Sequence, residues 1–144
     1  MRWIGLDIGD KTIGVAVSDP LFISAQGVTT IERIGIKKDT SKVLEYVKEY
    51  DADTVVCGLP LMLNGTDSPQ TEKVREFVTR LENKARSMGF KLNFVFQDER
   101  FTTKIAENAM IDAGMRREKR KEIIDRQAAV LILQSCMDAQ RPRL

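Results

Sequence analysis

The stretch that decides the fold is residues 2–18, which read RWIGLDIGDKTIGVAVS. Apolar residues alternate with small or polar ones on both sides of Gly9-Asp10-Lys11, and these three residues are a turn signal. The pattern therefore predicts two antiparallel strands joined by a tight turn. Asp7 lies at the end of the first strand, so an acid is expected where the chain is about to reverse.

The rest of the chain passes from a strand pattern to alternating helices and strands. The expected segments are a strand over 27–32, a helix around 43–50, a strand over 54–58, a loop over 59–69, a helix that starts at Ser68-Pro69 and ends at Gly89, a strand over 92–96, a helix from Thr102 or Thr103 to Gly114, and a helix over 122–139. This order predicts an α/β fold with a mixed five-stranded sheet and helices on both faces. We expect one domain over residues 1–139 and a frayed tail over 140–144.

The composition limits the chemistry that is available. The 144 residues include 23 Lys and Arg and 21 Asp and Glu, so the net charge of +2 says little about a polyanionic partner. The absence of histidine excludes Ser-His-Asp and Cys-His catalysis and argues against a zinc site of the usual kind. Two distant cysteines, Cys57 and Cys136, indicate a reduced, cytoplasmic protein. No signal peptide or membrane-spanning run is visible, so no membrane partner is expected.

Acidic residues follow two of the predicted strands and enter the last helix. Asp7 ends the first strand, Asp98-Glu99 follow the fifth, and Asp125 comes near the start of the last helix. If the first, fourth and fifth strands are parallel neighbours, their carboxyl ends share one edge, where open α/β sheets build their sites. Carboxylates that converge without histidine suit Mg²⁺ or Mn²⁺, and two such ions can promote phosphodiester hydrolysis.

Asp125 is the most informative of these acids. On a regular helix it shares a face with small and apolar residues at +3, +4, +7 and +11, which should pack on the sheet. A carboxylate on a packed face is costly unless something compensates its charge. A metal ion would do so, and pairing with a nearby Lys or Arg is the alternative.

A basic run precedes or opens the last helix. Its five cations are Arg116, Arg117, Lys119, Arg120 and Lys121. Cations at a helix N-terminus oppose the helix dipole, so a phosphate-binding role fits the run better than helix stabilisation does. A solvated surface stretch is the other interpretation. The loop 59–66 exposes apolar residues near the expected site, where it could cover the substrate, contact a partner or simply pack.

The start of the chain also has a competing interpretation. A strand, a glycine turn and a second strand, headed by an acid, resemble the first phosphate loop of actin-like and sugar-kinase-like ATPases. Those enzymes clamp a nucleotide between two such domains. Because 144 residues hold only one and no second copy of the motif is visible, the ATPase interpretation ranks below a nuclease.

Five ordered blocks of residues resemble the YqgF family, whose members are also called RuvX or pre-16S rRNA nucleases. The blocks are Gly5-Leu6-Asp7-Ile8-Gly9, Ile13 to Asp19, Gly58-Leu59-Pro60-Leu61 with Asn64-Gly65-Thr66, Asp98-Glu99-Arg100 with Thr102-Thr103, and Asp125 to Ala129 with Ile132-Leu133-Gln134. They extend to about residue 138. The family departs from this chain at Thr12, where it usually has a second basic residue, and at Met62-Leu63.

The resemblance implies a ribonuclease H-like fold and a cytoplasmic nuclease that depends on Mg²⁺ or Mn²⁺. It implies an acidic triad of Asp7, Glu99 and Asp125, and so selects Glu99 over its neighbour Asp98. The implied role is maturation of the 5′ end of 16S rRNA, so the partners would be structured RNA or a ribosome precursor. Resolution of branched DNA and non-catalytic binding of RNA are the alternatives.

Further residues would then serve the nucleic acid. Lys11 and Arg100 would help to hold phosphates, and the basic run 116–121 would guide the polymer. Asn64 and Gly65 would lie in the loop near the site.

Overall fold

The computed structural model describes residues 2–140, and of residues 101–106, 121–122 and 124–126 it describes the backbone only. Its elements in chain order are β1 (Arg2–Ile8), β2 (Thr12–Ser18), β3 (Ala25–Glu32), α1 (Ile36–Glu49), β4 (Ala52–Leu59), α2 (Pro69–Ser87), β5 (Asn93–Asp98), α3 (Glu99–Asp112) and α4 (Arg117–Gln140). This is the predicted order of elements. The tail residues 141–144 lie outside the described part, and α4 includes Gln140.

The five strands form one mixed sheet in the order β3-β2-β1-β4-β5. The predicted hairpin is confirmed, because β1 and β2 pair antiparallel with Asp7 opposite Gly14. The Gly9 N–H closes the turn on the Thr12 carbonyl at 2.9 Å. β1 pairs parallel with β4, and β4 pairs parallel with β5, so the carboxyl ends of these three strands meet at one edge.

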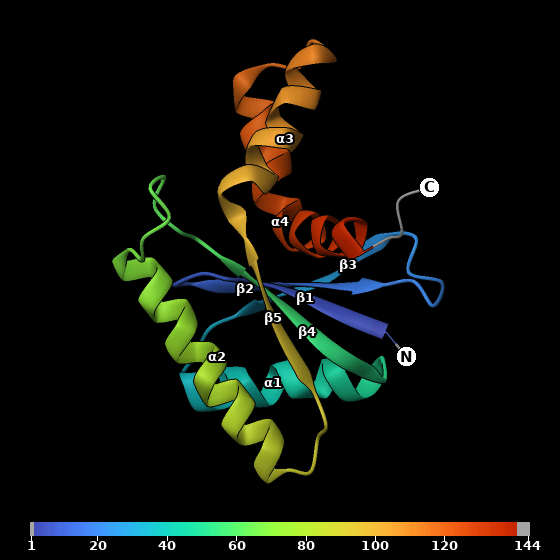
Figure 1. The fold of residues 1–144 in the computed structure, drawn as a ribbon, viewed down its shortest axis with the longest axis vertical. Helices are drawn as coiled ribbons and strands as arrows, with labels where there is room; N and C mark the ends of the chain where they lie inside the picture. Colours follow the sequence, from blue (N-terminus) through green and yellow to red (C-terminus); the bar gives the residue numbers. More distant parts are fainter. Residues whose placement is uncertain (1, 141–144) are drawn as a thin grey trace.

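Helices cover both faces of the sheet, as predicted (Figure 1). On one face α1 and α2 pack against alternate residues of β1 such as Ile4 and Leu6, which are fully buried with Val43 and Phe77. On the other face the C-terminal part of α4 packs on the sheet around a second, smaller cluster. Its buried members are Ala16, Val56, Ala129, Ile132, Leu133, Cys136 and Met137.

The helix α4 lies unusually close to β1 because β1 has a glycine beneath it. A Cβ at Gly5 would lie 2.7 Å from the Cβ of Leu133 and 2.9 Å from the Ala129 carbonyl oxygen. Gly58 of β4 has the same function, since a Cβ there would lie 2.5 Å from the Cδ1 of Ile132. Glycine at these positions therefore sets the distance between α4 and the sheet.

The α3–α4 hairpin extends away from the sheet, and α4 then bends back across it (Figure 1). The bend is at Gln127, whose φ of −116° and ψ of 15° are not helical. This corrects the expectation of one regular face from Asp125 to Cys136, because helical periodicity does not continue through the bend. Ala129, Ile132 and Cys136, beyond the bend, are buried as expected.

The predicted starts of the last two helices were wrong. α3 begins at Glu99 rather than near Thr102, because the Asp98 carboxylate accepts a hydrogen bond from the Arg100 N–H at 2.9 Å and so caps the helix. α4 begins at Arg117 rather than at 122. Arginine, lysine and glutamate are good helix formers, and Glu118 in the first turn offsets the unfavourable cations there. None of the helices in the described part has the length and hydropathy that a membrane span requires.

The close packing at Gly5 leads to a stability prediction. Replacing Gly5 with Ala should lower the free energy of unfolding by roughly 1–3 kcal/mol, because the added methyl group meets helix backbone that cannot move aside easily. Urea denaturation would measure the change. Gly27→Ala is the matched control, since a Cβ there meets Val130 at an ordinary 3.7 Å, and its stability should stay within about 0.5 kcal/mol of wild type. Equal effects of the two substitutions would contradict this account.

Candidate active site

Two of the three predicted acids come together at the carboxyl edge of the sheet. Asp7 is the penultimate residue of β1, and Glu99 is the first residue of α3, directly after β5. The Glu99 carboxyl group lies against Gly58 of β4, where a Cβ would be only 2.8 Å from its Cδ and 2.9 Å from its Oε1. The glycine that admits α4 to the sheet therefore also makes room for this carboxyl group.

The Glu99 side chain is half-buried and lies in an acidic environment. Burial, followed by the charges of Asp7 and Asp98, raises its pKa from 4.5 to about 7. Burial disfavours the ionised form, and neighbouring carboxylates oppose a further negative charge. Such an arrangement attracts a cation, and oxygen ligands suit a hard divalent ion. The donor set therefore fits Mg²⁺ or Mn²⁺.

Asp98 has a different role from its neighbour Glu99. The Arg100 guanidinium group holds it with contacts of 2.8 Å and 2.6 Å to Oδ2, and this pairing lowers the pKa of the Asp98 carboxyl group despite partial burial. Asp98 also caps α3. The negative charge of Asp98 is thus stabilised by Arg100, whereas burial and neighbouring acids disfavour a negative charge on Glu99.

The third acid, Asp125, lies in α4 two residues before the bend at Gln127. Its side chain lies outside the described residues. Among the side chains that are described, no three acids, cysteines or histidines form a group that could hold a metal ion. The convergence of Asp125 with Asp7 and Glu99 therefore stays a prediction.

A buried ion pair that sequence reasoning missed holds the turn after Asp7. Arg33 donates from Nε to Asp39 Oδ2 at 3.0 Å and from Nη1 to the Gly9 carbonyl oxygen at 2.9 Å. Asp39 also accepts from the Ile34 N–H at 3.0 Å, and its side chain is 1% exposed. The hydrogen bonds from Ile34 and Arg33 outweigh burial, and the pKa of Asp39 is lowered. No local pattern marks this link, because Gly9 and Arg33 are distant in the sequence.

The turn has two more supports from α2. Gln70 Nε2 donates to the Ile8 carbonyl oxygen at 3.5 Å, and Lys73 pairs with Asp10 at 3.3 Å. The segment after Asp7 is therefore fixed from both α1 and α2. Lys11, the predicted phosphate contact, is exposed at this turn.

The predicted basic run divides into cations with different positions. Arg116, Arg117 and Lys119 are exposed near the tip of the α3–α4 hairpin. Arg120 instead holds the hairpin together: it donates to the Met115 carbonyl oxygen at 2.7 Å and lies 3.9 Å from Glu107, with its side chain 16% exposed. The side chain of Lys121 lies outside the described residues.

The loop between β4 and α2 stands next to Glu99. Arg100 donates from Nη1 to the Leu63 carbonyl oxygen at 3.2 Å, so its guanidinium group connects the loop to Asp98 rather than facing open solvent. Asn64, a predicted loop residue near the site, accepts hydrogen bonds from the Thr66 N–H and hydroxyl. Gly65 packs against Arg100 and has a φ of +85°.

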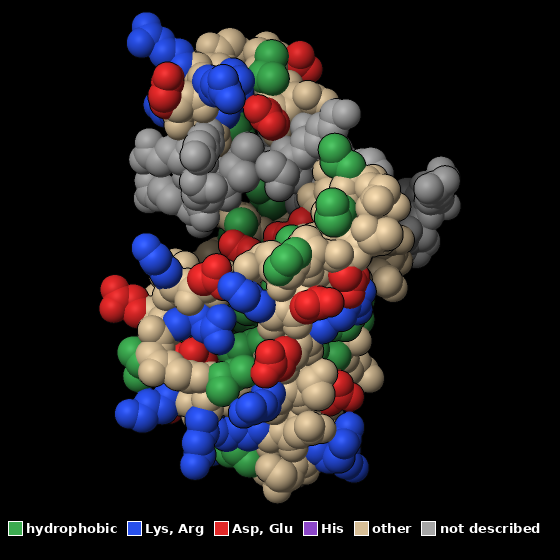
Figure 2. All heavy atoms as spheres, turned by 90° about the vertical axis from the view of Figure 1, so that its left-hand side faces the viewer, with side chains coloured by type: hydrophobic (Ala, Val, Ile, Leu, Met, Phe, Trp, Pro, Cys, Tyr) green, Lys and Arg blue, Asp and Glu red, His purple; other side chains and the backbone are tan. Residues whose placement is uncertain are grey.

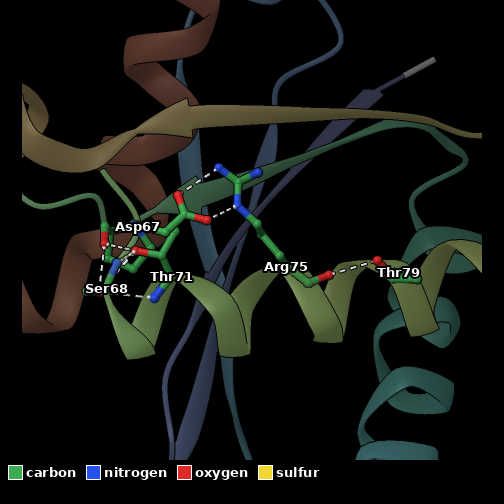
Figure 3. Close-up of polar contacts among 6 residues, drawn as sticks. Asp67, Ser68, Thr71, Arg75 and Thr79 are labelled. Atoms are coloured by element: carbon green, nitrogen blue, oxygen red, sulfur yellow. Dashed lines mark hydrogen bonds and ion pairs between the residues drawn. The ribbon is translucent and has the colours of Figure 1, made fainter. Parts of the chain in front are cut away.

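The far end of the loop is anchored by the start of α2 (Figure 3). The predicted Ser68-Pro69 start is confirmed, because Ser68 and Thr71 cap each other reciprocally. The Thr71 hydroxyl group also donates to the Pro60 carbonyl oxygen, and Arg75 pairs with Asp67 at 2.8 Å. These contacts fix both ends of the loop.

A groove runs between β3 and α4. It consists of two adjoining pockets of about 300 and 470 Å³ that share Gly27 and Val130 in their walls. The smaller pocket is also lined by Gly14, where a Cβ would lie 3.6 Å from the Cβ of Asp7. The larger is lined by Gln127 at the bend of α4. The groove therefore leads from the neighbourhood of Asp7 to the base of the α3–α4 hairpin.

Comparison with solved structures identifies this architecture as a ribonuclease H-like fold. The structure of T. thermophilus RuvC in complex with Holliday junction substrate aligns with a TM-score of 0.62 at 16% identity, covering 97% of this chain and 95% of that one. A second T. thermophilus RuvC structure aligns with a TM-score of 0.57 at 14% identity, covering 97% and 96%. These distant likenesses show the fold.

The chain belongs to the RuvX family, described as Holliday junction resolvase, which it matches over residues 1–139. It is similar to relatives that are provisionally named pre-16S rRNA nucleases. The relative from Clostridium tetani is 46% identical over 139 residues, 96% of this chain and 97% of that one. The relative from Thermoanaerobacter pseudethanolicus is 46% identical over 142 residues, 98% and 99% of the two chains. Membership of this family of nucleases makes the chain a hydrolase of phosphodiester bonds and decides against the ATPase interpretation.

The buried Arg33–Asp39 pair predicts a loss of stability on substitution. Arg33→Met should lower the free energy of unfolding by roughly 3 kcal/mol, because Asp39 would remain buried without its partner. Arg75→Met is the matched control: both arginines stack on a phenylalanine ring, at 5.1 and 5.4 Å, but the Arg75–Asp67 pair is exposed and should contribute less than about 1 kcal/mol. Chemical denaturation of both variants would test the difference, and similar losses would contradict it.

The raised pKa of Glu99 predicts a particular pH dependence of stability. Glu99 keeps its proton to about pH 7 when folded but loses it near pH 4.5 when unfolded, so without a divalent cation the free energy of unfolding should fall between these values. The contribution should be on the order of 2 kcal/mol. Glu99→Gln cannot titrate, so the difference between wild type and this variant isolates the effect. Urea denaturation across this pH range would measure it, and parallel pH profiles would refute it.

Proposed function

We propose that this protein is a divalent-metal-dependent nuclease that cleaves the precursor of 16S rRNA at its 5′ end. Asp7, Glu99 and Asp125 would hold Mg²⁺ or Mn²⁺. The observation that carries the proposal is the half-buried position of Glu99 near the charge of Asp7 at the carboxyl edge of the sheet. The names of the relatives support the choice of substrate. We also propose a cytoplasmic location.

The chemistry of the proposal is phosphodiester hydrolysis by water. The bound ions would supply a reactive water at neutral pH and stabilise the charge on the phosphate and the leaving oxygen. The residues of the chain would hold the ions by keeping the acidic side chains in place. Gly58 leaves room for the Glu99 carboxyl group, and Arg33 fixes the turn after Asp7. Arg116, Arg117 and Lys119 would contact the polymer backbone away from the acids.

A second candidate substrate is branched DNA. The description of the family as Holliday junction resolvase and the likeness of the fold to RuvC bound to a junction favour it. Binding of RNA without cleavage is the alternative of another kind. The three candidate functions, cleavage of rRNA, cleavage of branched DNA and binding of RNA, are all compatible with this fold and its basic hairpin. An assay is therefore needed to distinguish them.

The test compares an rRNA precursor with a four-way DNA junction in Mn²⁺ or Mg²⁺, using wild type and Asp7→Asn. We expect wild type to cleave the precursor at the 5′ side of the mature sequence and Asp7→Asn to lose on the order of 10²-fold or more in rate, because a ligand of the ions is removed. Preferred cleavage of the junction would select the resolvase alternative. Equal products from wild type and Asp7→Asn would overturn the nuclease proposal.

Metal affinity serves as the control for this assay. Calorimetry with Mn²⁺ should show binding to wild type that is weakened in Asp7→Asn, Glu99→Gln and Asp125→Asn. Asp98→Asn is the matched acid, because Asp98 adjoins Glu99 but pairs with Arg100, and asparagine retains the helix cap. If Asp98→Asn lost the ion and Asp125→Asn retained it, the assignment of ligands would be wrong.

A further inference from the structure

The loop between β4 and α2 presents the most exposed apolar side chain of the described residues. Leu63 is 92% exposed, and its neighbour Met62 is 50% exposed. Figure 2 views the side of the molecule on which α2 and this loop lie, and it shows hydrophobic side chains among both acidic and basic ones there. A single exposed leucine is ordinary on a protein surface, so its position and its support decide whether it has a role.

Hydrogen bonds within the loop close its tip. The Met62 N–H donates to the Thr66 carbonyl oxygen at 2.9 Å, and the Gly65 N–H donates to the Met62 carbonyl oxygen at 2.8 Å. Asn64 Oδ1 accepts from the Thr66 N–H at 3.1 Å and from its hydroxyl group at 2.6 Å. The loop is therefore a closed turn that keeps Leu63 at its outer end.

The same tip is joined to the acidic edge. Arg100, which follows Glu99, donates to the Leu63 carbonyl oxygen at 3.2 Å and is itself held by Asp98. Gly65 packs against the same guanidinium group, where a Cβ would be 3.3 Å from Nη1. The Arg100 side chain, which Asp98 holds, thus links Leu63 to the residue next to Glu99.

The charges next to the tip are paired with one another. Arg75 contacts Asp67 at 2.8 Å, and Arg100 contacts Asp98 at 2.6 Å. Arg75 and Arg100 therefore have acidic partners, which weakens their attraction for a phosphate group at the tip. What the tip offers to a nucleic acid is apolar surface, and the apolar surface of a nucleic acid is the face of a base.

We propose that Leu63, with Met62 beside it, packs on the face of an unstacked base next to the phosphate that is cleaved. This inference rests on the proposed nuclease function and specifies its substrate. Apolar side chains that contact base steps in this way must overcome the stacking of the duplex. That cost is least where bases are already unpaired, so the substrate class is nucleic acid with a junction between paired and unpaired segments rather than continuous duplex.

The experiment uses two synthetic RNA probes, each with one 2-aminopurine. The first is a stem–loop with a single-stranded 5′ extension and the fluorescent base at the junction, and the second is a fully paired duplex. In the Asp7→Asn background, binding of the first probe should raise the fluorescence, and Leu63→Ser should abolish the rise. In the otherwise wild-type enzyme, Leu63→Ser should slow cleavage of the first probe by roughly 5- to 20-fold, as expected for loss of one base contact.

The matched control is Leu21→Ser, because Leu21 is 76% exposed and lies between β2 and β3, outside the loop. It should change neither the fluorescence nor the cleavage rate. If Leu63→Ser behaved like Leu21→Ser on both probes, the base contact would be overturned while a cleavage defect in Asp7→Asn still supported the nuclease. An effect of Leu63→Ser only on cleavage within a ribosome precursor would also overturn it, in favour of a protein partner at the tip.

Discussion

The contact on which the rest of the structure depends is the packing of α4 on the sheet at Gly5. A β-carbon at this position would lie only 2.9 Å from the Ala129 carbonyl oxygen and 2.7 Å from the Leu133 Cβ. Because α4 approaches so closely, its apolar side chains bury Val56 and Ala16, and the bend at Gln127 comes near the sheet. A larger residue at position 5 would move the helix, and with it the position from which the α3–α4 hairpin extends.

The acidic edge is held against its own repulsion by contacts behind it. Burial and neighbouring charges disfavour the ionised form of Glu99, so the edge contributes little to the stability of the fold without a cation. The Arg33–Asp39 pair fixes the turn that follows Asp7 through the hydrogen bond from Arg33 to the Gly9 carbonyl oxygen. Asp98 and Glu99 are adjacent in the sequence but differ in environment, and Arg100 neutralises the charge of Asp98.

Local signals were sufficient to predict most of the fold. The turn at Gly9 and the Ser68-Pro69 start of α2 depend on residues a few positions apart, and both are confirmed. The cap of α3 was placed wrongly because threonine is also a common N-cap residue, and the choice between it and Asp98 depends on where β5 ends. The bend at Gln127 has no local sequence signature. It arises because α4 packs both on α3 and on the sheet, and this tertiary requirement cannot be read from neighbouring residues.

The same limit applies to the site. The order of strands along the chain predicted that Asp7 and Glu99 lie at one edge, and the parallel pairing of β1, β4 and β5 confirms it. The spacing could not decide which of the adjacent acids, Asp98 or Glu99, belongs to the site. The bends of the chain add a further constraint. α3 begins at Glu99, and α4 bends two residues after Asp125, so the two joints of the hairpin adjoin two of the three acids while Asp7 stays on the sheet. The backbone positions of Glu99 and Asp125 are therefore set where the hairpin joins the rest of the fold, whereas that of Asp7 is set within the sheet.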